Sequence, residues 1–149
     1  MSATAEALQA LLYEEIPLCR ALQVRVEHWQ EQRLCLSLPL GANSNPHGTQ
    51  FGGSLYCGAL LAGWGWLHLR LRELGLQGVV VIKDAQVSYL LPVDSDALAC
   101  CQAPEPEAWE QFLTSFRRRG RARLLLLSEV RNALGEVAVR FSGQFVLQR

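Results

Sequence analysis

Hydrophobic side chains alternate with other residues in two stretches near the start of the sequence. Leu22, Val24 and Val26 form the first set, and the second runs from Leu34 to Leu40 with a leucine at every other position. A period of two places one set of side chains on one face of a strand. The sequence therefore predicts two strands joined by a short turn at 30–32.

Four later stretches also have the character of strands. Residues 79–91 are rich in β-branched side chains and alternate, and residues 97–103 form a weaker candidate. Residues 121–131 and 136–147 flank the turn-forming segment 132–135, which is typical of a hairpin.

Helical spacing of apolar residues appears three times. Thr4–Glu15 carries leucines at helical spacing, with Thr4 as the expected N-cap and Pro17 ending the helix. Pro106 stands at an expected first helical position before four large apolar residues at spacings of three and four, the last of them Phe116. The apolar stretch 52–74 is too long for a strand and contains glycines and alanines that would let a sheet approach closely.

One long apolar helix among several strands favours an α+β fold, in which an antiparallel sheet of five or six strands wraps around a central helix. We expect a single domain over residues 1–149. Residues 51–69 approach the length of a membrane span, but five glycines dilute their hydrophobicity and the flanking strands need an apolar partner.

Charge and cysteine content narrow the function classes. Fourteen basic and fourteen acidic residues balance, so no general field attracts nucleic acid or an anionic membrane. The five cysteines lack metal-ligand spacing, so we expect reduced thiols, a cytoplasmic location and no metal site.

The segment from Asn45 to Ser54 is the best candidate for chemistry, because it runs from a loop into the first turn of the long helix. The first amides of a helix lack internal partners and can stabilise a carbonyl oxygen that gains negative charge. Gly52 and Gly53 keep side chains away from these amides. The same glycines could equally serve tight packing.

The sequence Asn-Pro-His-Gly-Thr-Gln-Phe-Gly-Gly at 45–53, with Ser-Tyr-Leu-Leu-Pro-Val at 88–93, resembles the hotdog-fold thioesterases, especially the YiiD C-terminal type. The resemblance implies a homodimer joined through the third strands, with acyl sites at the subunit boundary. It also implies that the Gly52 amide, with Gly53 beside it, polarises the thioester carbonyl, and that Asn45 positions this carbonyl or the attacking water.

The sequence departs from the family pattern at two positions. Phe51 replaces a histidine, and Leu60 replaces the usual catalytic carboxylate, so a substitute base is needed. Asp84, from either subunit, is the first candidate, because it lies in the third strand near the expected subunit boundary, where partial burial would raise its pKa. It could instead point outward with Gln86 and Ser88. His47 is the second candidate and could instead cap its own loop.

The remaining candidates are substrate contacts. Phe51 and His47 belong to this group, together with three residues in the first helical turns: Ser54, Tyr56 and Cys57. Cys57 could instead be a buried core residue. The arginines of 117–123 could hold coenzyme A phosphates or complement a helix C-terminus.

The expected function is hydrolysis of an acyl thioester, carried by coenzyme A or a carrier protein, without any other cofactor. A non-catalytic module that binds the same acyl carriers is the main alternative. A dehydratase acting on hydroxyacyl thioesters would need a His and carboxylate pair that the sequence does not provide. We expect homodimers, with tetramers as a further option, and no nucleic-acid or membrane partner.

Overall fold

The computed structural model describes residues 2–149. Its centre is a six-stranded antiparallel sheet in the order β1-β2-β4-β5-β6-β3. The strands are β1 (Arg25–Gln30), β2 (Arg33–Leu38), β3 (Val79–Tyr89), β4 (Ala97–Gln102), β5 (Arg121–Arg131) and β6 (Val137–Gln148). The helices are α1 (Ala3–Glu15), α2 (Leu18–Leu22), α3 (Leu40–Asn43), α4 (Gly52–Glu73) and α5 (Pro106–Arg119). This arrangement confirms the predicted α+β hotdog fold.

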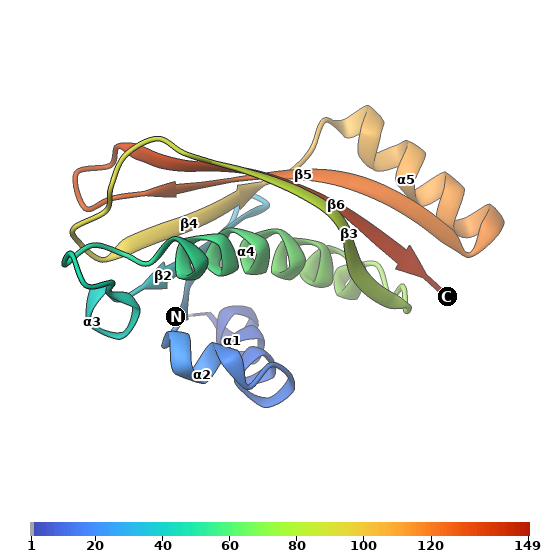
Figure 1. Cartoon of the computed structure of the whole chain (residues 1–149). Helices are drawn as coiled ribbons and strands as arrows, with labels where there is room; N and C mark the ends of the chain where they lie inside the picture. Colours follow the sequence, from blue (N-terminus) through green and yellow to red (C-terminus); the bar gives the residue numbers. More distant parts are fainter. Residues whose placement is uncertain (1) are drawn as a thin grey trace.

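The long helix α4 lies against the inner face of the sheet, and α1 and α2 lie on its other side (Figure 1). A Cβ atom at Gly58 would stand 2.5 Å from Leu38 Cδ1, and one at Gly65 would stand 2.7 Å from Leu34 Cδ2. Glycine at these positions therefore allows strand β2 to approach the helix closely. Among residues 2–149, no helix meets the length and hydrophobicity needed to span a bilayer.

The N-terminal segment differs from the sequence prediction in two details. The Ser2 hydroxyl accepts a hydrogen bond from the Ala5 N–H at 3.1 Å and so caps α1, which makes the prediction of Thr4 as N-cap wrong. Leu22 ends the short helix α2 and does not open a strand. Gln23 then adopts a left-handed conformation with φ 53°, and the strand begins only at Arg25.

Helix α5 packs against β5 and reaches α4 through an aromatic contact. The Trp109 ring meets Trp66 edge to face at 5.3 Å, and the Arg70 guanidinium lies 5.0 Å from the Trp109 ring centroid. Gly120 ends the helix at φ 72°, a conformation that glycine adopts without strain. The chain then enters the β5–β6 hairpin, whose second strand pairs with β3.

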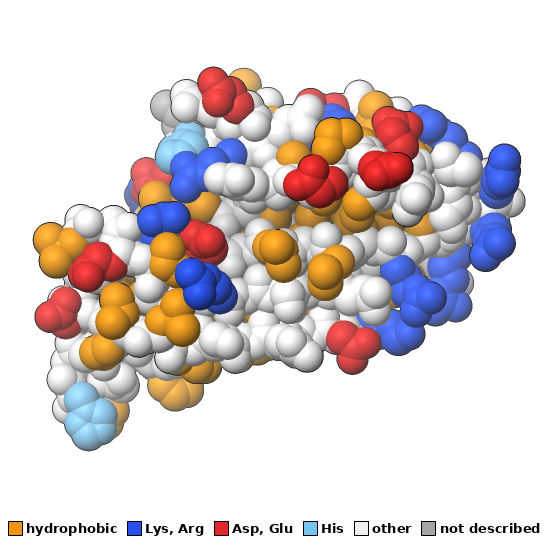
Figure 2. Space-filling model, turned by 90° about the horizontal axis from the view of Figure 1, so that it is seen from above, with side chains coloured by type: hydrophobic (Ala, Val, Ile, Leu, Met, Phe, Trp, Pro, Cys, Tyr) orange, Lys and Arg blue, Asp and Glu red, His pale blue; other side chains and the backbone are white. Residues whose placement is uncertain are grey.

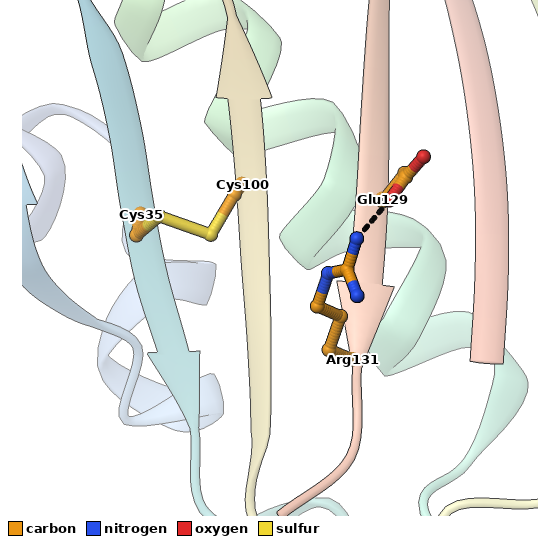
Figure 3. The surroundings of a disulfide bond; sticks show 4 residues. All are labelled: Cys35, Cys100, Glu129 and Arg131. Atoms are coloured by element: carbon orange, nitrogen blue, oxygen red, sulfur yellow. Dashed lines mark hydrogen bonds and ion pairs between the residues drawn. A yellow bond between two sulfur atoms is a disulfide. The ribbon is translucent and has the colours of Figure 1, made fainter. Parts of the chain in front are cut away.

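Two cysteines form a disulfide between neighbouring strands. Cys35 of β2 and Cys100 of β4 are direct cross-strand partners, and their sulfur atoms are bonded (Figure 3). The expectation of five reduced thiols is therefore wrong for this pair, because strand pairing brings residues 65 positions apart to a Cα separation of 4.2 Å. Cys19, Cys57 and Cys101 are free thiols.

Candidate functional site

The first two amides of α4 are unoccupied donors beside a partly open surface. Gly52 and Gly53 are partly exposed, and no acceptor within residues 2–149 binds either N–H group. The Phe51 carbonyl oxygen accepts hydrogen bonds from the Ser54 and Leu55 N–H groups at 3.0 and 3.1 Å. Since Phe51 C=O and Gly52 N–H belong to one planar peptide group, these bonds also fix the direction of the Gly52 donor.

Tyr89, the last residue of β3, lies over this helix start. Its hydroxyl donates a hydrogen bond to the Gly52 carbonyl oxygen at 2.8 Å, and its ring atoms lie 3.4 Å from the place that a Gly52 Cβ would occupy. Because Gly52 C=O and Gly53 N–H share one peptide plane, Tyr89 fixes the direction of the Gly53 donor. Tyr89 stands within the 88–93 segment that carries the family resemblance, but nothing local in the sequence indicates this role.

Asn45 holds its own loop together. Its Oδ1 accepts hydrogen bonds from the His47 N–H at 2.9 Å and the Thr49 N–H at 3.2 Å, and its Nδ2 donates to the Thr49 hydroxyl at 2.8 Å. One amide hydrogen of Asn45 remains for a ligand. His47 is exposed in the same loop, and the structure does not bring its side chain into a hydrogen bond within residues 2–149.

Gln50 connects the loop to two neighbouring segments. It is buried, and its Nε2 donates to the Leu38 carbonyl at 2.9 Å and to the Ser95 carbonyl at 3.2 Å. Its backbone N–H donates to the Val93 carbonyl at 2.7 Å. A glutamine between a polar loop and a helix gives no sequence signal of burial, so this role of Gln50 could not be predicted.

The predicted substrate contacts fall into two groups. Phe51 is exposed and its ring covers Gly53, while Tyr56 is half-buried and meets Phe141 edge to face at 5.5 Å. Ser54 is buried. Cys57 is half-buried, and burial raises the pKa of its thiol, so the thiol remains protonated at neutral pH.

Tyr89, Tyr56 and Cys57 form one cluster at the helix start. Burial raises the pKa of Tyr89 above its ordinary value, with smaller contributions from Tyr56 and Cys57. The Tyr89 phenol therefore stays protonated and able to donate at neutral pH. Neither this cluster nor the covering Phe51 contains a carboxylate.

Asp84 lies on the other face of the sheet. It pairs with Gln144, whereas the next pair, Ala85 with Gly143, belongs to the inner face, where Ala85 packs on the core. Paired residues point to the same face and successive residues alternate, so Asp84 points away from α4. Asp84 is also exposed in the single chain, which fits the alternative that it points outward; its partial burial at a subunit boundary stays a prediction.

Strand β3 is an open edge of the sheet (Figure 1). Val79 and Val81 on this strand are 65% and 51% exposed. The neighbouring face of α4 is only partly covered along a stripe of side chains spaced by four residues: Tyr56, Leu60, Trp64 and His68. Burial, followed by the charge of Arg72, lowers the pKa of His68, which keeps this stripe uncharged at neutral pH.

Comparison with known proteins places the whole domain in context. A family model described as "Putative thioesterase (yiiD_Cterm)" matches residues 5–149. A protein with unknown function from Chlorobaculum tepidum is 28% identical with a TM-score of 0.92, over 97% of this chain and 94% of that one. A "putative thioesterase" from Shewanella oneidensis is 27% identical with a TM-score of 0.86, over 100% of both chains. A "probable thioesterase" from Pseudomonas aeruginosa shares the fold at 21% identity and a TM-score of 0.80, over 96% of this chain and 94% of that one.

Proposed function

The chain belongs to the thioesterase family of the YiiD C-terminal type, and we propose that it hydrolyses an acyl thioester of coenzyme A or of an acyl-carrier protein. The observation that supports this proposal is the pair of oriented, unoccupied amides at the start of α4. No further cofactor is required, because coenzyme A enters as part of the substrate.

Oxyanion stabilisation is the main contribution of this site. When water adds to the thioester carbonyl, the oxygen gains a full negative charge, which the Gly52 and Gly53 N–H groups bind at the positive end of a 22-residue helix. Donors already directed at the developing charge need no reorganisation during the reaction. The tetrahedral intermediate then expels the thiolate, and the acid and thiol leave.

Tyr89 acts as a positioning residue in this mechanism. Its hydrogen bond to the Gly52 carbonyl holds the Gly53 N–H in place and polarises the same peptide group. The Asn45 side chain holds its loop in place through its bonds to Thr49. We assign the remaining hydrogen of the Asn45 side-chain amide to orienting the substrate carbonyl or the attacking water.

Water activation does not rely on Asp84 of the same chain, since that carboxylate points away from α4. The water loses its proton to solvent during attack, so the oxyanion donors carry most of the rate enhancement. Cys57 and Tyr56 contribute the wall beside the acyl group, and Phe51 covers it from outside.

We propose that two chains pair through their β3 edges. An exposed edge strand of 11 residues offers unpaired backbone groups to a second copy. Antiparallel pairing of two β3 strands would set the start of the partner's strand beside Tyr89 and would cover the stripe on α4. Val81→Lys should then convert the dimer to monomer in sedimentation experiments and lower turnover.

A non-catalytic acyl-carrier binding module is the alternative, and one observation favours it. The resemblance implies a catalytic carboxylate at position 60, but this chain has Leu60 there, packed against the core, and a leucine can neither accept a proton nor attack a carbonyl.

The deciding experiment is a screen of acyl-CoA and acyl-carrier-protein substrates of several chain lengths with a thiol-reactive dye. If the wild type releases thiol and the Tyr89→Phe variant does so more slowly, the result supports the proposal that the protein is an enzyme. Binding without thiol release on any substrate selects the binding module.

A further inference from the structure

A groove opens on the outer face of the sheet, away from the start of α4. It has a volume of about 800 Å³ and runs between α5 and strands β2, β4 and β5. Figure 2 shows this face of the molecule, with hydrophobic side chains in a hollow between polar ones. Cavities of this volume are typical of small-molecule sites.

The groove has an apolar floor. Alternation along β5 turns Leu125 and Leu127 outward, where they are 55% and 62% exposed. Pro104, Ala108 and Phe112 line the opposite side. These two leucines are neighbours on the outer face of β5, are largely exposed, and face further apolar atoms. Such a surface favours an apolar ligand over water.

One end of the groove carries a cation without a partner. The Nε atom of Arg33 is buried, and no acceptor within residues 2–149 binds it. Arg33 also lines a second hollow of about 410 Å³, so its side chain borders both spaces. A buried donor without an acceptor is costly, and an anion held by the same guanidinium would offset part of this cost.

The other charges that line the groove leave it with an excess of positive charge. Arg131 is paired with Glu129 at 2.9 Å. Of the remaining lining residues, Arg33 and Arg123 are cationic and Glu105 is anionic. None of these three forms an ion pair among the described residues.

We infer that this groove binds a carboxylate that bears an alkyl chain, with its head group on Arg33 and its chain over the two leucines. Arg33 pairs with Gln102, and Cys101 pairs with Ser128 on the next strand. This register places Leu127 two strand spacings from Arg33, about 10 Å, and Leu125 about 7 Å further along β5. The span suits a medium-length fatty acid, and the site is separate from the proposed thioester site.

Calorimetric titration of the full chain with dodecanoate, kept below its micelle concentration, tests the inference. We expect saturable binding that Arg33→Gln and Leu127→Gln each weaken at least tenfold. Arg140→Gln and Leu134→Gln are the matched controls, because both residues are exposed and neither lines the groove, and they should bind as the wild type does. Dodecanol, which lacks the charge, should bind at least tenfold more weakly.

Thioester turnover is measured in the same variants and should not change, so the two proposals can fail separately. Dodecanoate binding that is unaffected by both groove variants would overturn the inference, since binding would then lie elsewhere. A change of oligomeric state in Leu127→Gln without any dodecanoate binding to the wild type would also overturn it, because the groove would then be an interface between copies.

Discussion

Removal of the Tyr89 hydroxyl tests whether the Gly53 donor is held in place from outside the helix. In Tyr89→Phe, the ring still covers Gly52, but the 2.8 Å hydrogen bond to the Gly52 carbonyl is lost. The peptide group that carries the Gly53 N–H then loses both its restraint and its polarisation. We expect kcat to fall while KM changes little, because the effect concerns charge that develops only in the transition state.

The size of the effect follows from the strength of one neutral hydrogen bond. A net contribution of about 0.5–1.5 kcal/mol corresponds to a decrease in kcat of about 2- to 12-fold. Loss of an entire oxyanion donor costs about 100- to 1,000-fold. A decrease between these ranges would mean that the peptide group turns away when Tyr89 releases it.

The assay is steady-state thiol release with the best acyl substrate, at pH values on both sides of 10. Tyr13→Phe is the matched control, since the Tyr13 hydroxyl on α1 donates to the carbonyl of Val24, the residue before β1, at 2.9 Å, and its loss should affect stability alone. Because burial raises the pKa of Tyr89, the phenol donates below that raised pKa and ceases to donate above it. The ratio of wild-type to Tyr89→Phe rates should therefore stay constant up to pH 10 and fall at higher pH.

Two results would refute this reasoning. One is an unchanged kcat in Tyr89→Phe while the wild type is active. The other is an equal decrease in Tyr13→Phe, which would attribute the loss to general destabilisation.

Three further predictions concern neighbouring groups. Cys57→Ser should retain kcat, because burial keeps the Cys57 thiol protonated at neutral pH; a complete loss of turnover would instead make Cys57 the nucleophile. Gln50→Leu should lower the free energy of unfolding by about 1–3 kcal/mol, measured by urea denaturation, because it removes the donor to the Leu38 and Ser95 carbonyls; unchanged stability would contradict this role. Thiol titration of the denatured, unreduced chain should find three free thiols, and five after reduction. Reduction should lower the free energy of unfolding by up to about 4 kcal/mol, because the bridge spans 65 residues. Five thiols before reduction would exclude the disulfide.

Most of the fold could be predicted from the sequence, because the patterns that specify it are local. Apolar residues at every second position identified 79–91 and 121–131 as strands. Pro106 marked the start of α5. The first strand was predicted to begin too early. Leu22 and Val24 are both buried, but Leu22 ends the short helix α2 and Val24 follows the left-handed residue Gln23. Alternation of apolar residues does not distinguish these conformations.

The site was only partly predictable, because its main contacts join distant segments. The helix start at Gly52 follows from local sequence, but the hydrogen bond from Tyr89 spans 37 positions and that from Gln50 to Ser95 spans 45. The outward face of Asp84, by contrast, follows from local alternation, since Ala85 and Val87 pack on the core while Asp84 and Gln86 are exposed.

The Gly52 N–H can be removed almost in isolation, and this gives the most direct test of the proposed oxyanion site. Phe51 already has the extended conformation, φ −61° and ψ 132°, that a residue before proline adopts, and proline is well tolerated at the first position of a helix. Gly52→Pro therefore deletes the donor, whereas Gly52→Ala keeps it and places its Cβ at an ordinary 3.4 Å from Tyr89. Measured as kcat for thioester hydrolysis, Gly52→Pro should lose about 100- to 1,000-fold while Gly52→Ala stays close to the wild type. Equal rates in the two variants would contradict the assignment of this amide to the oxyanion.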